Sequence, residues 1–408
     1  MPTPSFVTTT RPTIRPTTTV QSPQGSAEHT SADTSVHLSD TPAAPPQTPP
    51  QVPRGQTGQH RAPRRGLSAR VASLRLRDMI AAHALRVVDR FRVVRTLDIA
   101  AACFPERPFK AALTAAQRAV RGLVKQGLLR RYKTERFQTV YGLTQRGADW
   151  LGERGDAASA SVRRVSDMTN PEHRLWAQFL VLCARARGWT AWTEAELLHQ
   201  LSQSQPPAQG YLTVEVWQGG HKVSKLLRPD AVAVFPGDKE VCWFEIDRSK
   251  RGSQRLADLA ALARAVGRRL ADGRVLRLVS VQGKTERIAR DAVRLLMQLA
   301  AESAKQQLVP GRRQFRRVED GVYAVWASLE KTHPDGRVSL VDACVGHVVV
   351  QLLPVWMPKL RVTAAAPTHP PGWFEDNLLP FRRPSSLGPW TAPVSPLLPL
   401  LPLQNATD

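Results

Sequence analysis

The chain has 408 residues, with 57 Lys and Arg against 34 Asp and Glu, which gives a formal net charge of +23 at pH 7. Apolar residues make up 42% of the chain, enough to build hydrophobic cores, so a wholly disordered basic protein is excluded. The basic excess favours a polyanionic partner. No apolar run reaches the roughly 18 residues of a membrane helix, and the start of the chain lacks the basic and apolar regions of a signal peptide. We therefore expect a cytoplasmic protein without a membrane-spanning segment.

Four cysteines lie far apart in the chain, at Cys103, Cys183, Cys242 and Cys344. They form no C-x-x-C pair and have no histidine at metal-ligand spacing. Apolar residues surround each of them, which predicts reduced core residues and argues against a structural zinc site.

Both ends of the chain differ in composition from the middle. Residues 1–66 are rich in proline and threonine and show almost no apolar periodicity. Such a stretch cannot bury enough surface to offset its chain entropy, so we expect a disordered tail. Residues 365–408 are also punctuated by proline, which removes backbone donors and predicts an extended segment on the surface of the body or of a partner.

About half of the net positive charge lies in residues 67–166. Apolar residues recur at helical spacing over 67–91, without Gly or Pro. A short second helix is expected from Thr96, as its cap, to a stop at Pro105. A third helix follows over 109–125, with an apolar stripe on one face and polar and basic side chains on the other.

Gly127 supplies the stop of the third helix, and two β-like runs at 129–133 and 137–143 flank a polar turn. This order of elements is that of a winged helix-turn-helix, which we place at 67–156. The third helix is then expected to enter the major groove, and the hairpin to hold phosphates. The residues expected to contact DNA are Lys110, Gln117, Arg118, Arg121, Lys125, Arg130, Arg131, Lys133 and Arg136. Two alternatives stay open: the charges only solvate exposed faces, or the winged helix binds a protein.

A second block, residues 167–308, alternates helices and strands. In chain order these are a helix at 170–187, strands at 189–193, 226–235 and 240–247, a helix at 256–266, a strand at 275–281 and a helix at 288–299. The order predicts a mixed sheet with helices on both faces, so the fold class is α/β with more than one domain. Three further β-like runs at 321–329, 336–345 and 348–356 predict a small antiparallel sheet appended in residues 309–364.

Three carboxylates stand out in the second block. Asp230 follows Pro229 at the start of one strand, while Glu245 and Asp247 occupy alternate positions near the end of the next, so they can converge on one side of the sheet. Oxygen ligands of this kind suit Mg²⁺ or Mn²⁺, with Asp230 and Glu245 as the expected metal ligands and all three as catalytic candidates. The arrangement is that of the PD-(D/E)xK nucleases, except that Asp247 stands where the lysine is expected.

Each carboxylate also has a structural alternative. Asp230 can be a turn residue. Glu245 lies in a run that otherwise reads as a buried strand and therefore needs a partner, either a cation or an ion pair with Arg228 or Arg248. Asp247 can be a third ligand, a general base or the cap of the next helix.

Four further residues are candidates for the same site. Lys225 and Lys250 are alternatives for the missing lysine, although lysines near strand ends are mostly solvated. Glu172 and His173, at the start of the preceding helix, can complete the site, although a lone histidine there is more often structural.

Several short motifs occur together in a fixed order over residues 77–299. They are Cys103-Phe104-Pro105, Gly127-Leu128-Leu129-Arg130, Tyr141-Gly142-Leu143-Thr144, His173, Arg228-Pro229-Asp230-Ala231 and Phe244-Glu245-Ile246-Asp247-Arg248. Because it has these motifs in this order, the chain resembles the replication-relaxation family of bacterial plasmids and mobile elements. The proteins of this family pair a winged helix with a nuclease-like domain. The resemblance implies a role in plasmid replication or DNA relaxation, with duplex DNA and replication or mobilisation proteins as partners.

The sequence therefore predicts a replication-relaxation protein that binds duplex DNA and carries a nuclease-like domain, active or inactive. One alternative is a metal-dependent DNA endonuclease that the winged helix targets. Another is a transcriptional regulator whose α/β domain serves for dimerisation. The missing lysine leaves catalysis open, and the sequence leaves the oligomeric state undefined.

Overall fold

The structure, a computed structural model, describes only part of the chain, and all of that part belongs to one compact unit, Arg64–Asp408. The described residues are 67–107, 109–134, 138–161, 171–204, 210–249, 252–353, 384, 391 and 393–397. The predicted tail at 1–66 and most of the proline-rich end therefore lie outside the described residues.

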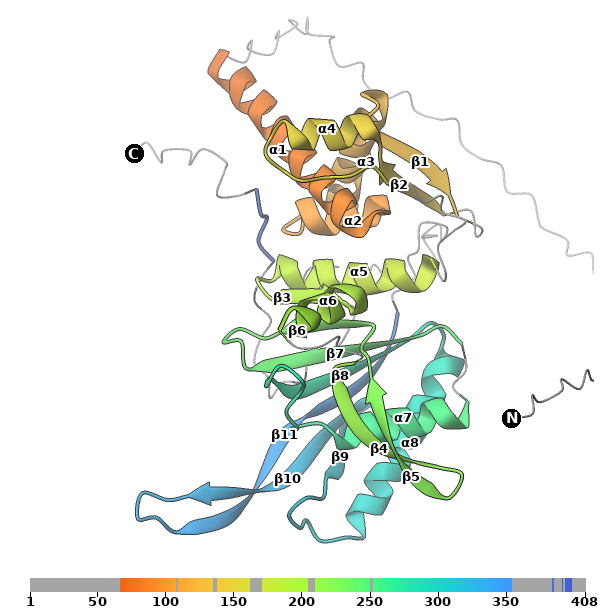
Figure 1. Ribbon diagram of the computed structural model, residues 1–408, viewed down its shortest axis with the longest axis vertical. Helices are drawn as coiled ribbons and strands as arrows, with labels where there is room; N and C mark the ends of the chain where they lie inside the picture. Colours follow the sequence, from red (N-terminus) through yellow and green to blue (C-terminus); the bar gives the residue numbers. More distant parts are fainter. Residues whose placement is uncertain are drawn as a thin grey trace, which may run out of the picture. The chain divides into compact units, whose positions relative to one another are not determined.

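The first described block contains three helices, a hairpin and a fourth helix (Figure 1). Their bounds are α1 (Leu67–Phe91), α2 (Thr96–Cys103), α3 (Phe109–Lys125), β1 (Leu129–Lys133), β2 (Thr139–Leu143) and α4 (Gln145–Gly152). β1 and β2 pair antiparallel, and Gly127 adopts a φ of 71° directly after α3, as a helix stop requires. The helices expected over 67–91 and 109–125 are thus confirmed.

The expected cap of α2 is wrong by one residue. Arg95, not Thr96, is the N-cap residue, and the carboxylate of Asp98 accepts a hydrogen bond from the backbone N–H of Arg95 at 2.7 Å. The reason is that Asp98, in the first turn, satisfies this backbone donor, so no side-chain oxygen is needed at Thr96.

A seven-stranded mixed sheet forms the second block, in the order β3-β6-β7-β8-β11-β10-β9. Its strands are β3 (Thr190–Thr193), β6 (Ala231–Val234), β7 (Glu240–Asp247), β8 (Val275–Gly283), β9 (Gln314–Glu319), β10 (Val322–Thr332) and β11 (Val338–Leu352). β8 runs parallel to both β7 and β11, and the other neighbours are antiparallel.

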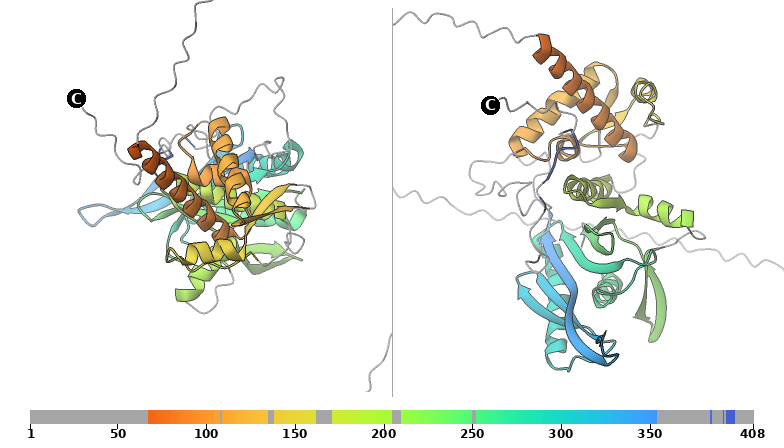
Figure 2. Two further views of the ribbon diagram at one scale, coloured as in Figure 1. Left: turned by 90° about the horizontal axis from the view of Figure 1, so that it is seen from above. Right: turned by 90° about the vertical axis from the view of Figure 1, so that its left-hand side faces the viewer.

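Helices cover both faces of this sheet (Figures 1 and 2). Phe244 and Ile246 of β7 pack in the same hydrophobic cluster as α5 (Pro171–Ala186), whereas Trp243 packs with α7 (Ser253–Arg264) and α8 (Glu286–Ala304). Alternate residues of one strand thus serve two cores, as the period of two requires. The predicted mixed sheet with helices on both faces is confirmed.

Four elements of this block were not predicted: α6 (Glu194–Ser204), β4 (Leu212–Gln218), β5 (His221–Leu227) and β9. β4 and β5 form a separate two-stranded sheet. The run expected as one strand over 226–235 is therefore wrong, because it is divided between β5 and β6. Pro229 lies at the division, where it removes a backbone donor and restricts the residue before it.

The strands expected over 309–364 are antiparallel, but they do not form a separate sheet. β11 pairs in parallel with β8 from His347 to Leu352, so β9, β10 and β11 extend the central sheet. β11 is also continuous where the sequence predicted a break after residue 345. The parallel pairing joins segments more than sixty residues apart, which local periodicity does not report.

The described cysteines form no disulfide, and three of them, Cys103, Cys183 and Cys242, are buried, whereas Cys344 is half-buried. Among the described helices, none is both long and apolar enough to cross a bilayer. Near the C-terminus, Val394 donates its backbone N–H to the Ala186 carbonyl at 2.9 Å, so the described part of the proline-rich end lies on α5.

A buried polar contact joins α2 to α5. Arg95 and Asp98 are both fully buried and form an ion pair at 2.8 Å. The Arg95 guanidinium also donates to the Leu175 carbonyl at 2.7 Å, and the Gln178 amide donates to Asp98 at 2.9 Å and to the Val93 carbonyl at 3.1 Å. We call these five residues the α2–α5 contact. Because buried charges need partners of this kind, the contact fixes α2 against α5.

Removal of one charge from the α2–α5 contact should destabilise the chain strongly. We expect Asp98→Ala to lower the free energy of unfolding by about 3–5 kcal/mol, because it leaves the Arg95 guanidinium buried without its counter-charge. Urea denaturation of the full chain measures the loss. The control is Glu215→Ala, which breaks an exposed ion pair with Lys222 and should change the free energy of unfolding by less than about 1 kcal/mol. Equal losses in the two variants would contradict the role of the α2–α5 contact.

Candidate functional site

α3 presents its polar face to solvent. Its buried side chains are Ala112, Ala116, Val120 and Leu123. All five α3 residues expected to contact DNA are exposed, and they are Lys110, Gln117, Arg118, Arg121 and Lys125.

The hairpin next to α3 adds further positive charge. Arg130, Arg131 and Lys133 of β1 are exposed. The Arg130 guanidinium lies 5.6 Å from the centre of the Tyr132 ring, and the Lys133 ammonium donates to the Thr139 hydroxyl at 2.9 Å. Arg136, also expected to contact DNA, lies outside the described residues.

No acidic residue occurs in the sequence between Glu106 and Glu135. Within the part of the chain that the structure describes, no carboxylate forms an ion pair with the basic side chains of α3 or with Arg130 and Arg131. We call the exposed cations of α3 and β1 the basic surface; they are Lys110, Arg118, Arg121, Lys125, Arg130, Arg131 and Lys133. An excess of charge of one sign gives this surface a field that attracts a polyanion.

The three predicted carboxylates lie around the end of β7, each with its own contacts. Asp230, just before β6, contacts the His173 imidazole at 2.8 Å through one oxygen and accepts the Ile246 backbone N–H at 2.6 Å through the other. Glu245 is half-buried and accepts a hydrogen bond from the Trp243 indole at 2.8 Å. Both contacts of Asp230 come from elements distant in the sequence, so its position is set by the tertiary fold.

Asp247 is almost fully buried, and Arg255 of α7 lies 3.3 Å from its carboxylate. At the position where the PD-(D/E)xK motif has its lysine, this chain therefore has a buried aspartate that is paired with Arg255. Of the two alternatives for that lysine, Lys225 forms an ion pair with Asp258 at 2.7 Å, and Lys250 lies outside the described residues.

Sequence reasoning missed one basic residue at this end of the sheet. Lys284 directly follows β8, and its ammonium lies 3.2 Å from the buried Glu172 carboxylate, which also pairs with Arg248. Its backbone N–H donates to the Asp247 carbonyl at 2.8 Å. A signal was present, because Lys284 follows the strand predicted at 275–281, but using it requires knowing that this strand lies beside β7.

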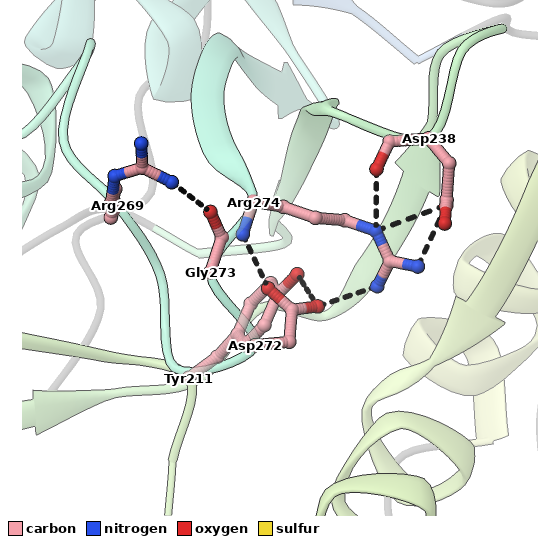
Figure 3. A network of polar contacts seen from close by, with 6 residues as sticks. All are labelled: Tyr211, Asp238, Arg269, Asp272, Gly273 and Arg274. Carbon is pink, nitrogen blue, oxygen red and sulfur yellow. Dashed lines mark hydrogen bonds and ion pairs between the residues drawn. The ribbon is translucent and has the colours of Figure 1, made fainter.

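A second chain of contacts leads to Glu245 on the face of the sheet that Trp243 occupies. Arg274 pairs with Asp272, which accepts the Tyr211 hydroxyl at 2.7 Å (Figure 3). The Tyr211 ring stacks on Trp243 with ring centres 6.0 Å apart, and Trp243 in turn donates to Glu245. Burial raises the pKa of Tyr211, so its hydroxyl stays a donor at neutral pH. The network restrains the ring that orients Glu245.

The donor set does not fit a preformed cation site. Among the described residues, no group of three or more His, Cys, Asp and Glu side chains is placed to hold a metal ion. Both oxygens of Asp230 already take part in hydrogen bonds. The expected Mg²⁺ or Mn²⁺ stays a prediction, and we assign no chemical step to it.

The geometry defines a mixed α/β protein with an exposed basic helix in one block and a group of charged residues at a strand end in the other. The family model described as Replication-relaxation matches residues 85–266. Residues 85–266 therefore match the family that the sequence resembles, and the resemblance is confirmed over these residues. The match includes the basic surface, α5 and all three carboxylates. No curated protein and no solved structure matches the chain.

The contact between His173 and Asp230 should make stability depend on pH. The hydrogen bond with Asp230 raises the pKa of His173 above its ordinary value of 6.5. Its contribution to stability is therefore complete below pH 6.5 and is lost as the pH rises through the raised value. We expect His173→Gln to cost more stability at about pH 5.5 than at about pH 9, measured by urea denaturation.

A histidine outside the site gives the matched control. His221 is exposed on β5, so His221→Gln should cost little stability at either pH. A loss on His173→Gln that is the same at both pH values would contradict the charged pair.

Proposed function

We propose that this protein binds duplex DNA through the basic surface and acts in the replication of a plasmid or other mobile element. The observation that carries the proposal is an exposed helix face rich in Arg and Lys, next to a basic hairpin, in a stretch of sequence without acids. The family match supports the replication-related role.

The order of elements supports a winged-helix mode of binding. A helix that follows a short helix and precedes a hairpin presents its exposed face to the major groove in winged helices. In this mode Gln117, Arg118 and Arg121 reach base edges, where arginine forms paired hydrogen bonds with guanine. Arg130 and Arg131 lie on the hairpin and contact phosphates, which fixes the register without reading sequence.

Metal-dependent cleavage of DNA is the competing proposal. It requires a metal ion at Asp230 and Glu245 that activates a water molecule for hydrolysis. A supercoiled plasmid incubated with Mg²⁺ or Mn²⁺ tests it directly. Cleavage by the wild type and not by Glu245→Ala would make the protein a nuclease. Binding without cleavage would leave the replication role with an inactive nuclease-like domain.

Charge reversal on α3 tests DNA binding in the full chain. We expect Arg118→Glu with Arg121→Glu to weaken binding to duplex DNA by about 2–6 kcal/mol, that is at least about 30-fold, because two cationic contacts are lost. Fluorescence anisotropy over a salt series measures the affinity, and the wild type should lose affinity steeply as salt rises.

The matched control lies on α8. Arg287 and Arg290 have the same spacing as the α3 pair and are also exposed. Reversal of both should leave the affinity nearly unchanged, because they lie outside the basic surface. Equal losses from the two reversals would mean that binding follows total charge, and the proposed surface would be wrong.

A comparison of two single variants separates base reading from phosphate contact. Arg121→Ala should relax the sequence preference at one position and cost about 1–3 kcal/mol, whereas Arg131→Ala should weaken binding to all sequences alike. Selection from a random DNA library followed by affinity measurement distinguishes them. Sequence-blind effects of both variants would show that α3 does not read bases.

A further inference from the structure

The ends of β10 and β11 form a hairpin that leaves the body of the sheet. Among the residues that the structure describes, 328–342 pair only with each other, because β9 pairs with β10 no further than Trp326 and β8 pairs with β11 only from His347. Figure 1 and the left view of Figure 2 show this hairpin extending away from the rest of the sheet. We call residues 328–342 the arm.

Exposed apolar side chains are concentrated on the arm. Val338 is 60% exposed, Leu340 55%, Leu329 43% and Val341 40%. Cross-strand pairing places Leu329 beside Val341 on one face, and Leu340 lies on the other face, so neither face is covered by the body. Apolar surface grouped in this way marks an interaction site rather than ordinary scatter.

The arm differs from the basic surface in its charge. The arm carries both signs, as Glu330, Asp335 and Asp342 against Lys331 and Arg337, and Arg337 pairs with Asp335 at 2.7 Å. A surface without net positive charge is not suited to a polyanion. The partner of the arm is therefore a protein surface that is itself apolar and of mixed charge.

The two edges of the arm differ in how open they are. The β10 edge carries the adjacent charges Glu330 and Lys331, and charged residues, lysine above all, protect an edge strand from pairing. The β11 edge runs from Val338 to Ala343 with Asp342 as its one charge. Nearer the body of the sheet, the β11 edge is not open for pairing at Cys344, because the Arg277 guanidinium donates to the Cys344 carbonyl at 2.9 Å.

A second copy of the chain fits the β11 edge. Two-fold antiparallel pairing places one residue opposite itself. With Leu340 at that position, Val338 faces Asp342 and Ser339 faces Val341 of the second copy, so no like charges are opposed. Val338, Leu340 and Val341, three of the four exposed apolar side chains, then lie beside side chains of the second copy. Because the β11 edge is complementary to itself in this register, we take a second copy of the chain as the partner.

We propose that the arm is the interface through which two copies of this chain form a dimer, with the β11 edges pairing antiparallel around Leu340. The proposal goes beyond DNA binding and does not depend on it. A dimer presents the basic surface twice, which is the arrangement that an operator with two half-sites requires.

Analytical ultracentrifugation of the full chain without DNA tests the proposal. The wild type should sediment at twice the chain mass of 45.1 kDa at micromolar concentration, and Leu340→Lys should sediment as a monomer. The control is Val318→Lys on β9, a residue that is 57% exposed but lies outside the arm, and it should remain a dimer. A monomeric wild type, or a Leu340→Lys variant that still dimerises, overturns the proposal.

Oxidative cross-linking tests the register in a Cys344→Ser background. Leu340→Cys should form a disulfide between two copies, because the residue lies opposite itself, whereas Leu329→Cys on the other strand of the arm should not. Cross-linking at Leu329 equal to that at Leu340 overturns the pairing of β11 edges. The circular dichroism of each variant should match that of the wild type, since all the substituted arm residues are exposed.

Discussion

Arg95 and Asp98 form an ion pair that solvent does not reach, at the junction of α2 and α5. Burial of two charges costs several kcal/mol for each ion, and their attraction offsets this cost only when further hydrogen bonds satisfy the remaining polar atoms. The Leu175 carbonyl and the Gln178 amide, both on α5, supply those bonds. The pair is therefore stable only while α5 lies against α2, and the positions of the two helices depend on each other.

Through this contact, α5 links the two candidate regions of the protein. At one end of the helix, Glu172 and His173 contact the charged groups near the end of β7. In its middle, Gln178 contacts Asp98, and the α2 helix that bears Asp98 packs against α3. One hydrophobic cluster runs without interruption from the first four helices to the face of the sheet under α5. One hydrophobic cluster thus lies between the basic surface and the carboxylates.

The same packing explains why the carboxylates make the contacts they do. Asp230 lies at the end of a hairpin and depends on an imidazole from α5 and a backbone N–H from β7. Glu245 depends on the Trp243 indole, on which the Tyr211 ring stacks. Buried or half-buried carboxylates of this kind need donors, and here α5 and β7 supply them.

Sequence alone determined the features that follow from local periodicity: the extents of α1 and α3, the exposed basic face of α3 and the hairpin after Gly127. The motifs along the chain also indicated the family whose model matches residues 85–266. Sequence alone did not determine the partners of the charged residues. Arg95 and Asp98 have the spacing of an exposed pair on a helix, and only α5 makes them buried. His173 and Asp230 are 57 residues apart, and Lys284 and Glu172 are 112 apart. Which residues meet over such separations depends on strand order and helix packing, and periodicity along the chain does not encode either one.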